Sequence, residues 1–279
     1  MIGQLLQWLI NVWLAVTGRV RRFTDHPWLK GPVGDGKTIG DKYYDTFAAA
    51  NSYKVTNTTD GGLLRDFKAV LSDKDIAADK LNKRIIHFYE HTVQYKLEVW
   101  SQWYKPMSFF AKILIRTIST RMNQMNIPLE PLETSRGMSN EVLHIKDKAT
   151  DELLYACWLR KSILSGRVVY AGFYSACVIK GEKFVRVIFP LPDGNVTVLL
   201  KAVVQEDGSV KLISKGKHFG DAGYYRVRRH NANSVKVRHI PLTESIHVFE
   251  DNEGVLRTDH VFWFMGFKLL HLHYKIIER

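Results

Sequence analysis

The sequence contains little cysteine, and its apolar N-terminal stretch is too short to cross a bilayer as a helix. Only two cysteines, Cys157 and Cys177, occur in 279 residues, and no C-x-x-C pair is present. These counts exclude a disulfide framework and a zinc site built from cysteine pairs. Both thiols lie in apolar, strand-like runs, which predicts buried, reduced cysteines in a cytoplasmic protein. One bridge between neighbouring strands is the alternative.

The sequence also has no G-x-S-x-G motif and no internal repeat, so neither a nucleophile elbow nor a repeat architecture is expected. Positive charge is what it has in excess, with 40 Lys and Arg against 28 Asp and Glu and a net charge of +12. This balance favours anionic partners such as acidic lipid or a phosphorylated small molecule. Nucleic acid is not expected, because few aromatic residues interleave with the basic ones and no nucleic-acid motif occurs.

Residues 1–23 are expected to form an amphipathic helix with a basic end. The apolar stretch over 5–16 is shorter than the roughly 20 residues that span a bilayer. Arg19, Arg21 and Arg22 follow this stretch, which reverses the charge order of a secretory signal. Two interpretations stay open: an anchor at an acidic membrane surface, or a helix packed on the protein's own core or on a second subunit.

The region over 24–132 is expected to be mainly helical. Apolar residues recur with a 3.6-residue period over 41–51, 75–103 and 107–125, which predicts three helices. Glycine, proline and polar residues predict loops over 24–40 and 52–62.

From about residue 139 the apolar pattern changes to a period of two, and short turn sequences divide it into about ten segments. Short connections favour antiparallel neighbours. Strands are expected over 140–146, 152–161, 167–180, 184–190, 195–205, 209–214, 223–230, 234–240, 244–250 and 255–277, the last one broken near Gly266.

The expected fold class is α+β, with a helical N-terminal half packed against a mainly antiparallel C-terminal β-barrel or strongly curled sheet. A β-sandwich is the alternative, since so many strands need closure or a second layer to hide their edges. The expected domains are an N-terminal helix over 1–23, a helical region over 24–132 and a β domain over 133–279. In strand number the β half is similar to lipocalin-type barrels, but the G-x-W signature of that family does not precede the first strand, so the chain is assigned to no family.

Two short motifs are typical of enzymes. The segment from Gly31 to Thr38, GPVGDGKT, matches the phosphate-binding G-x-x-x-x-G-K-[ST] pattern, in which Lys37 would contact phosphates. The residues before it do not read as a buried strand, so a glycine-rich surface loop is the favoured interpretation and nucleotide binding the alternative.

The second motif, His87-Phe88-Tyr89-Glu90-His91, resembles the H-x-x-E-H motif of pitrilysin-type metallopeptidases over these five residues. On a helix, His87 and His91 lie one turn apart and can share a metal, with Glu90 as general base. That family also needs a third, acidic ligand on a later helix. The bland alternative is a pair of partly exposed histidines beside an ordinary glutamate.

The β half offers a cationic face and a histidine pair. Alternation places basic residues of two successive strands on one face, which can hold an anionic headgroup or face solvent. On the last expected strand, His271 and His273 share a face and can chelate a metal, with Asp259 and His260 upstream. The expected ligand-binding residues are Tyr224, Arg226, Arg228, Lys236, Arg238, His260, His271 and His273.

Dense aromatic residues in the β half predict either a filled core or the lining of an apolar cavity. The leading hypothesis is a protein that binds an apolar or amphiphilic small molecule in the β half, with the N-terminal helix near an acidic membrane surface. Its location would then be cytoplasmic and peripheral to the membrane. This hypothesis depends on an interior that stays partly empty. A metal-dependent hydrolase and a nucleotide-binding protein are the alternatives, and the sequence leaves the cofactor unknown. The aromatic residues concerned are Trp158, Tyr170, Phe173, Tyr174, Phe184, Phe189, Phe262, Trp263, Phe264 and Phe267.

Overall fold

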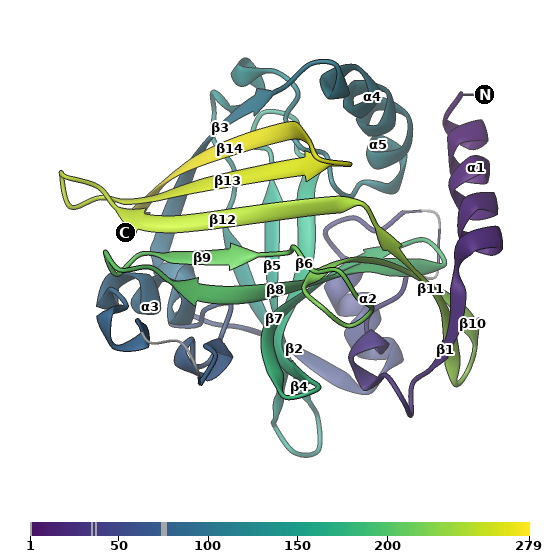
Figure 1. Cartoon of the computed structure of the whole chain (residues 1–279), viewed down its shortest axis with the longest axis horizontal. Helices are drawn as coiled ribbons and strands as arrows, with labels where there is room; N and C mark the ends of the chain where they lie inside the picture. Colours follow the sequence, from purple (N-terminus) through teal and green to yellow (C-terminus); the bar gives the residue numbers. More distant parts are fainter. Residues whose placement is uncertain (1, 35, 37, 74–76) are drawn as a thin grey trace.

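The computed structural model describes residues 2–34, 36, 38–73 and 77–279, and antiparallel strands dominate them. The helices are few and short (Figure 1). The strands are β1 (Arg19–Arg22), β2 (Tyr53–Asn57), β3 (Tyr95–Trp103), β4 (Glu141–Asp147), β5 (Leu153–Lys161), β6 (Val168–Ile179), β7 (Glu182–Leu191), β8 (Gly194–Val204), β9 (Val210–Ile213), β10 (Gly223–Asn231), β11 (Ser234–Ile240), β12 (Leu242–Glu250), β13 (Leu256–Phe264) and β14 (Phe267–Glu278). The α-helices are α1 (Ile2–Thr17), α2 (Tyr43–Ala50), α3 (Lys83–Glu90), α4 (Met107–Leu114) and α5 (Thr120–Met122).

All fourteen strands belong to one sheet, whose main path runs β2-β4-β5-β6-β7-β8-β9-β12-β13-β14-β3. The sheet forks at β8. One half of this strand pairs with β10 and the other half with β9, while β7 occupies its opposite edge. The β10-β11 hairpin and β1 extend the shorter branch. The main path ends at β2 and β3 without closing, so the expected barrel and the alternative sandwich are both wrong.

The expected helical N-terminal half is also wrong. Residues 95–103, expected within a helix over 75–103, form β3 and pair with β14, and β2 replaces an expected loop. The sequence YKLEVWSQW alternates, with Tyr95, Leu97 and Val99 buried and the residues between them more exposed. Apolar residues spaced by four satisfy both a helical and a strand period over so short a run. Pairing with the C-terminal strand decides between them.

Other predictions are confirmed. The expected strands from 140–146 onward appear as β4 to β14, with the break at Gly266. The helix expected over 107–125 appears as α4, a π-helical turn over Ile115–Ser119, and α5. Whether 1–23, 24–132 and 133–279 fold as separate units stays a prediction. Both cysteines are free, as predicted, although Cys177 is only partly buried.

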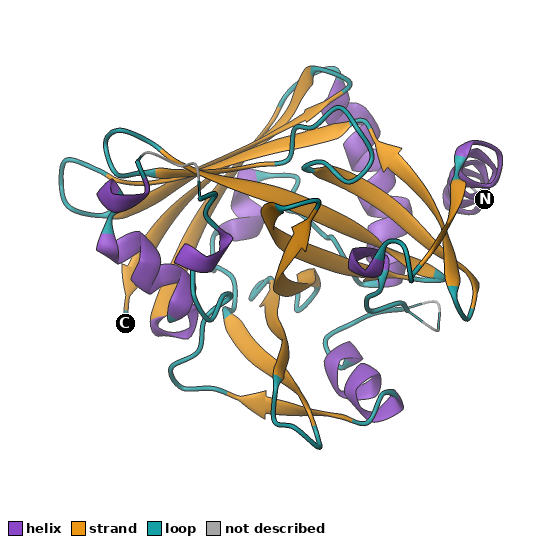
Figure 2. Cartoon of the chain, turned by 60° about the horizontal axis from the view of Figure 1, so that its bottom comes forward, coloured by secondary structure: helices purple, strands orange, loops and turns teal. Residues whose placement is uncertain are grey.

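The sheet bends so that β12, β13 and β14 cross in front of β5 and β6 (Figure 1). The main apolar cluster lies between these layers and takes residues from β3 to β14. The opposite face of β5 and β6 is covered by α2, which lies apart from the front layer in the second view (Figure 2). Strands β5 and β6 are therefore buried on both faces.

Helix α1 stands at the side of the molecule beside β1 and β11 (Figure 2). Its N-terminal part is close to the π-helical turn, because a Cβ added at Gly3 would lie 2.7 Å from the carbonyl oxygen of Thr117. Among the described helices, none combines the length and the apolar character that a membrane span requires.

Candidate functional site

A cavity of about 140 Å³ lies inside the main apolar cluster. Alternation along each strand sends every second side chain into it, so Trp158 and Arg160 line the cavity from β5 while Cys157 and Leu159 face α2. Residues 125–128, which follow α5, complete the wall. The expected aromatic lining is there in part, namely Trp158, Tyr170, Tyr174, Phe189 and Phe262.

The cavity wall carries few charged groups. Glu244 of β12 is 5% exposed and accepts a hydrogen bond from Nε2 of His260 at 2.5 Å. Tyr224 lies beside this carboxylate, which adds to the effect of burial in raising the pKa of the phenol. Arg160 is fully buried on the neighbouring wall. The cavity is thus apolar with two polar points, a Glu-His-Tyr group and a guanidinium.

Tyrosine hydroxyls line much of the remaining wall. Burial raises the pKa of Tyr89, Tyr170, Tyr174, Tyr224 and Tyr274 above the ordinary value for a phenol. These hydroxyls therefore keep their protons at neutral pH and can donate hydrogen bonds to an acceptor in the cavity.

The basic residues of the predicted cationic face lie opposite one another on neighbouring strands, but two of them contact a helix. Arg226 pairs with Arg238 and Arg228 with Lys236 across β10 and β11. The Nζ atom of Lys236 donates to Ala15 O at 2.6 Å, and Arg238 reaches the carbonyl of the last residue of α1. Cations at a helix C-terminus satisfy its free carbonyls and offset its dipole. Two of the predicted ligand-binding cations thus hold α1 on the sheet.

Arg226 lies deeper in the same hairpin. Its Nη1 donates to Asn195 O at 3.1 Å and to Val227 O at 2.5 Å. Burial, together with the neighbouring Arg228, lowers the pKa of Arg226 to about 10. Tyr224, on the same face, turns into the cavity instead. The predicted ligand residues of this hairpin therefore divide between the cavity, the interior and α1.

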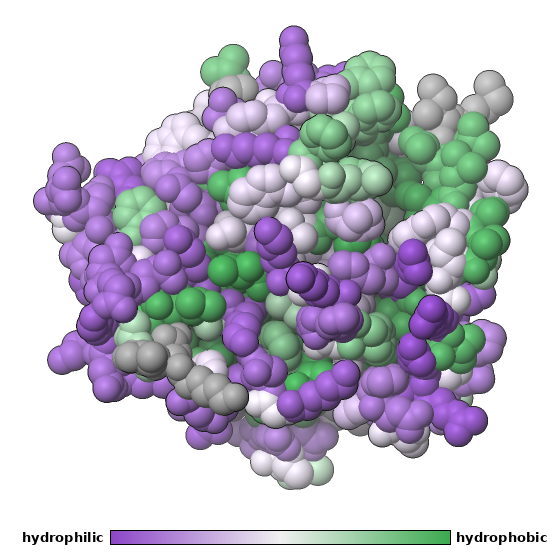
Figure 3. Space-filling model, viewed as in Figure 1, coloured by the Kyte–Doolittle hydropathy of each residue, from purple (hydrophilic) through white to green (hydrophobic). Residues whose placement is uncertain are grey.

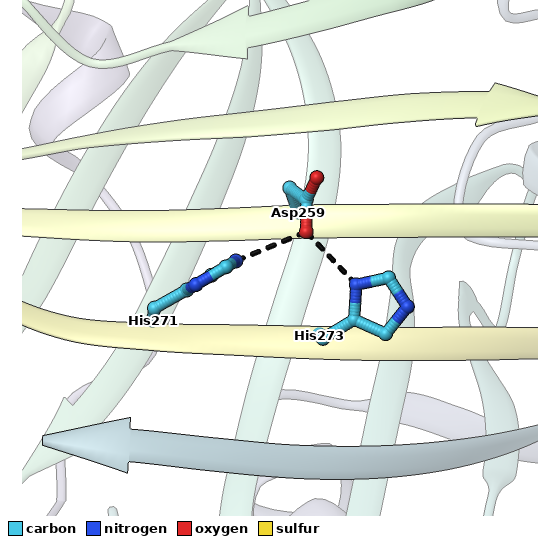
Figure 4. A group of neighbouring side chains, drawn as sticks. All are labelled: Asp259, His271 and His273. Atoms are coloured by element: carbon cyan, nitrogen blue, oxygen red, sulfur yellow. Dashed lines mark hydrogen bonds and ion pairs between the residues drawn. The ribbon is translucent and has the colours of Figure 1, made fainter.

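His271 and His273 project from β14 toward Asp259 on β13 (Figure 4). The Oδ1 atom of Asp259 lies 3.0 Å from Nε2 of His271 and 2.8 Å from Nδ1 of His273. Partial burial acts to raise the pKa of Asp259, but the hydrogen bonds from His273 and His271 outweigh it and the net shift is downward. The potential ligand atoms lie within 4.8 Å of one another, and no other such trio occurs among the described residues.

The two histidines of the His87–His91 motif lie at the end of α3, and each forms a hydrogen bond with a different partner. Nδ1 of His87 hydrogen-bonds to the Tyr95 hydroxyl at 2.7 Å, and Nδ1 of His91 to Asp60 at 2.6 Å. Glu90 accepts from the backbone N–H of Phe67 at 2.8 Å. The carboxylate of Glu90 is therefore occupied by a backbone hydrogen bond. The rings of His87 and His91 stack on one another.

The phosphate-loop motif includes Asp35 and Lys37, which lie outside the described residues. Of the rest, Gly34 forms a parallel bridge with Pro192, and Asn195 donates to Pro32 O at 2.9 Å. A 3₁₀ turn precedes the motif, and the next helix, α2, begins only at residue 43. The described part is a loop laid along the sheet, and nucleotide binding stays untested.

Apolar side chains gather on the surface over α1 and α4 (Figure 3). No residue of α4 is buried. We name this surface the helical patch. Basic residues follow both helices along the chain, Arg19 and Arg22 after α1 and Arg116 and Arg121 after α4, and we call them its basic border. The helical patch consists of Leu5, Trp8, Leu9, Val12, Val16, Phe109, Phe110 and Leu114, which are 38% to 78% exposed.

Four residues of these sites were not predicted from the sequence. Arg160 and Glu244 occupy inward positions of strands whose other inward residues are apolar, and that contrast was the available signal. Phe109 and Phe110 are adjacent, so they cannot share one narrow apolar stripe on α4. Their neighbouring positions indicate a broad apolar face.

The comparisons with known proteins give one distant relative. No protein-family model and no solved structure matches the chain. The chain is 26% identical over 244 residues to the uncharacterized membrane protein YndJ of Bacillus subtilis (strain 168). The match covers 86% of this chain and 41% of that protein, so the chain spans less than half the length of its relative.

Proposed function

We propose that this protein binds a small amphiphilic molecule in the cavity enclosed by its sheet, at the surface of a membrane. The observation that carries the proposal is the apolar cavity of about 140 Å³ at the centre of the main cluster. Protein interiors are close-packed, and few voids exceed one water molecule. A space several times that size, lined by aromatic and aliphatic side chains, has the kind of lining found in small-molecule sites.

The size of the cavity limits the ligand. An engineered apolar cavity of about 150 Å³ stays dry and binds benzene. With its walls unmoved, the cavity holds one ring or a short alkyl chain as the buried part of the ligand. A long acyl chain requires the wall to open.

The membrane part of the proposal rests on the helical patch and its basic border. Aromatic and aliphatic side chains beside arginines suit the interface of an acidic bilayer, where rings lie at headgroup level and guanidinium groups meet phosphates. The relative in Bacillus subtilis is named a membrane protein, which agrees with such a location.

Ligand binding is tested with a graded series of ring compounds and n-alkyl acids on the full chain. Binding is followed by isothermal titration and by the rise of the melting temperature with ligand concentration. We expect ring-sized ligands to bind and affinity to stop rising once the chain exceeds the cavity. If no member of the series binds, the cavity proposal is rejected.

Membrane binding is tested by flotation with phosphatidylcholine vesicles that contain about one third phosphatidylserine. The variant Trp8→Ser/Phe110→Ser should lose most of the binding, while Val178→Ser, a 65% exposed apolar residue on β6, should keep it. These substitutions are preferable to removal of residues 1–23, which would also remove β1 from the sheet. Equal flotation of all three proteins would reject the helical patch as the membrane contact.

A second candidate function is divalent metal binding by Asp259, His271 and His273. Two histidines and a carboxylate leave positions open for water or substrate, an arrangement used by zinc hydrolases and non-haem iron enzymes. Metal-dependent hydrolysis at this place remains the alternative to small-molecule binding. The trio lies on partly exposed side chains, and the half-exposed ring of Trp100 lies 6.1 Å from that of His273.

The metal candidate is tested by adding Co²⁺ to metal-free protein and recording its visible absorption. One Co²⁺ per chain is expected, with loss of the spectrum in His271→Ala/His273→Ala. The exposed His230 supplies the matched control, His230→Ala. A spectrum unchanged in the double variant would reject the site.

A further inference from the structure

Arg160 is a fully buried cation at the wall of the cavity. It lies on β5 opposite Tyr170 of β6, with Trp158 two residues earlier on the same face. Its exposed fraction is 0%. A strand position surrounded by apolar neighbours normally carries an apolar side chain, because an isolated charge loses its hydration there.

No carboxylate neutralises this guanidinium among the described residues. Each described ion pair of an arginine involves Arg84 or Arg257 instead. Glu244, the carboxylate in the same cavity wall, is already paired with His260 at 2.5 Å. The charge of Arg160 is therefore left without a counter-ion from the described part of the chain.

The hydrogen bonds of Arg160 are also incomplete. A guanidinium has five N–H donors in a fixed fork. The Nη2 atom donates to Leu97 O at 3.4 Å. The phenols of Tyr170 and Tyr274 lie close enough for the guanidinium to act on the pKa of both. The Nε atom is buried and has no acceptor among the described residues.

Aromatic rings surround the group. The guanidinium carbon lies 5.6 Å from the ring centre of Trp158, 6.0 Å from that of Tyr170 and 5.5 Å from that of Tyr274. Cation–π contacts of this kind soften the cost of burial but supply neither a negative charge nor an acceptor for Nε. The fork thus retains a donor and a charge that a ligand can satisfy.

We propose that Arg160 anchors the single anionic oxygen group, a carboxylate or a phosphate, of an amphiphile whose apolar body fills the cavity. This inference rests on the proposed small-molecule binding and adds the chemical class of the ligand. Arginine suits both groups, because its planar fork matches two oxygens at once. The neighbouring tyrosine hydroxyls can donate to the same oxygens.

The test compares three ligands that share one apolar body: the carboxylic acid, the phosphate monoester and the uncharged alcohol. A charge-assisted hydrogen bond contributes about 1.5–3 kcal/mol, which corresponds to roughly tenfold to 150-fold in affinity. Wild-type protein should prefer at least one anion over the alcohol by such a factor. The stronger anion identifies the headgroup.

The variant Arg160→Met keeps the length and apolar contacts of the side chain and removes its charge. It should bind the acid, the phosphate and the alcohol equally, with the affinity for the alcohol unchanged or improved. Its melting temperature should be equal to or above that of wild type, because a buried unpaired charge is gone. Arg160→Lys should keep part of the preference for anions. Arg186 lies on the face of β7 that points away from the cavity, so Arg186→Met should keep all of this preference.

The outcomes separate the two proposals. Failure of all three ligands to bind wild type rejects the cavity proposal itself. Equal binding of acid, phosphate and alcohol by wild type rejects only the role of Arg160. A lower melting temperature of Arg160→Met with an unchanged preference for anions would show that the arginine supports the fold and holds no ligand.

Discussion

The two faces of β5 and β6 are built from the same strands and differ in how they are filled. On the face covered by α2, Phe173 contacts the rings of Tyr43, Tyr44 and Tyr155 and has no exposed surface. The Tyr44 hydroxyl reaches the Trp158 carbonyl at 3.1 Å. On the opposite face the side chains surround a cavity and a buried charge. One face serves stability, and the other gives up contacts to keep space.

This difference concerns stability: the two faces of one sheet lose different amounts of packing energy. Close packing maximises dispersion contacts, so an unfilled volume and an unpaired charge both lower stability. Proteins commonly accept such losses at binding sites. The face that lines the cavity shows both features.

The largest expected effect comes from truncating matched leucines on the two faces. Leu159 faces α2 and Leu200 lines the cavity, and both are 2% exposed. Leu159→Ala should lower the unfolding free energy by about 3–5 kcal/mol and Leu200→Ala by about 2–3 kcal/mol, because Leu200 has an empty volume on one side. Urea unfolding measures both, and an equal or reversed order would remove the distinction between the faces.

Added volume should have the opposite asymmetry. Ala171→Val, on the face toward α2, should cost about 1–3 kcal/mol by overpacking. Val198→Leu adds one carbon at the cavity wall and should change stability by less than about 1 kcal/mol, since burial of the added group offsets local adjustment. Val198→Leu should also weaken the binding of ring-sized ligands. Thermal unfolding with and without ligand supplies both measurements. A large loss of stability in Val198→Leu would mean that the added carbon cannot enter the cavity.

A smaller effect concerns pH. Burial, with a smaller contribution from Lys146, lowers the pKa of His144 below its ordinary value of 6.5, although the hydrogen bond to the Gly62 carbonyl acts in the opposite direction. Between the lowered and the ordinary pKa the unfolded chain binds more protons, so stability falls as pH falls below about 7 and levels off beneath the folded pKa. For this half-exposed group the change is on the order of 0.5 kcal/mol after screening.

His144→Gln should therefore flatten part of the pH dependence of the urea midpoint between about pH 7 and 5. The exposed His230 provides the control, and His230→Gln should leave the dependence as it is. If His144→Gln steepened the dependence, the sign of the shift would be wrong.

The smallest effect on stability is expected at the helical patch. Phe109 and Phe110 are 63% and 61% exposed. Phe109→Ser/Phe110→Ser should change the unfolding free energy by no more than about 0.5 kcal/mol. A loss well above about 1 kcal/mol would indicate that α4 packs on protein, which would favour the interpretation of a docked helix over that of a membrane contact.

The period-two pattern after residue 139 was enough to predict β4 to β14, because each strand has one face that must be buried whatever its partner is. A period of two was not enough to predict β3. Residues 95–103 follow α3 closely, and their apolar residues also agree with a helical spacing. The expected helical half failed for this reason, and because β2 was too short and polar to be distinguished from a loop.

The candidate sites were predictable to different degrees. His271 and His273 share a strand face, so their proximity follows from alternation, but the meeting with Asp259 depends on the pairing of β13 and β14. The basic residues of β10 and β11 were predicted to share a face and do so. That Lys236 and Arg238 would cap α1, more than 200 residues earlier, required the fold.

The sequence by itself determined the strand periodicity, the apolar N-terminal helix with its basic end, and the large number of aromatic residues available to the interior. Each of these follows from local spacing and side-chain chemistry. Only the tertiary structure decided that the sheet forks at β8, that its interior keeps a cavity, and that Arg160 is buried there with no counter-ion among the described residues. These features depend on contacts between distant segments and on the volume left after packing, and neither quantity is a property of a local stretch of chain.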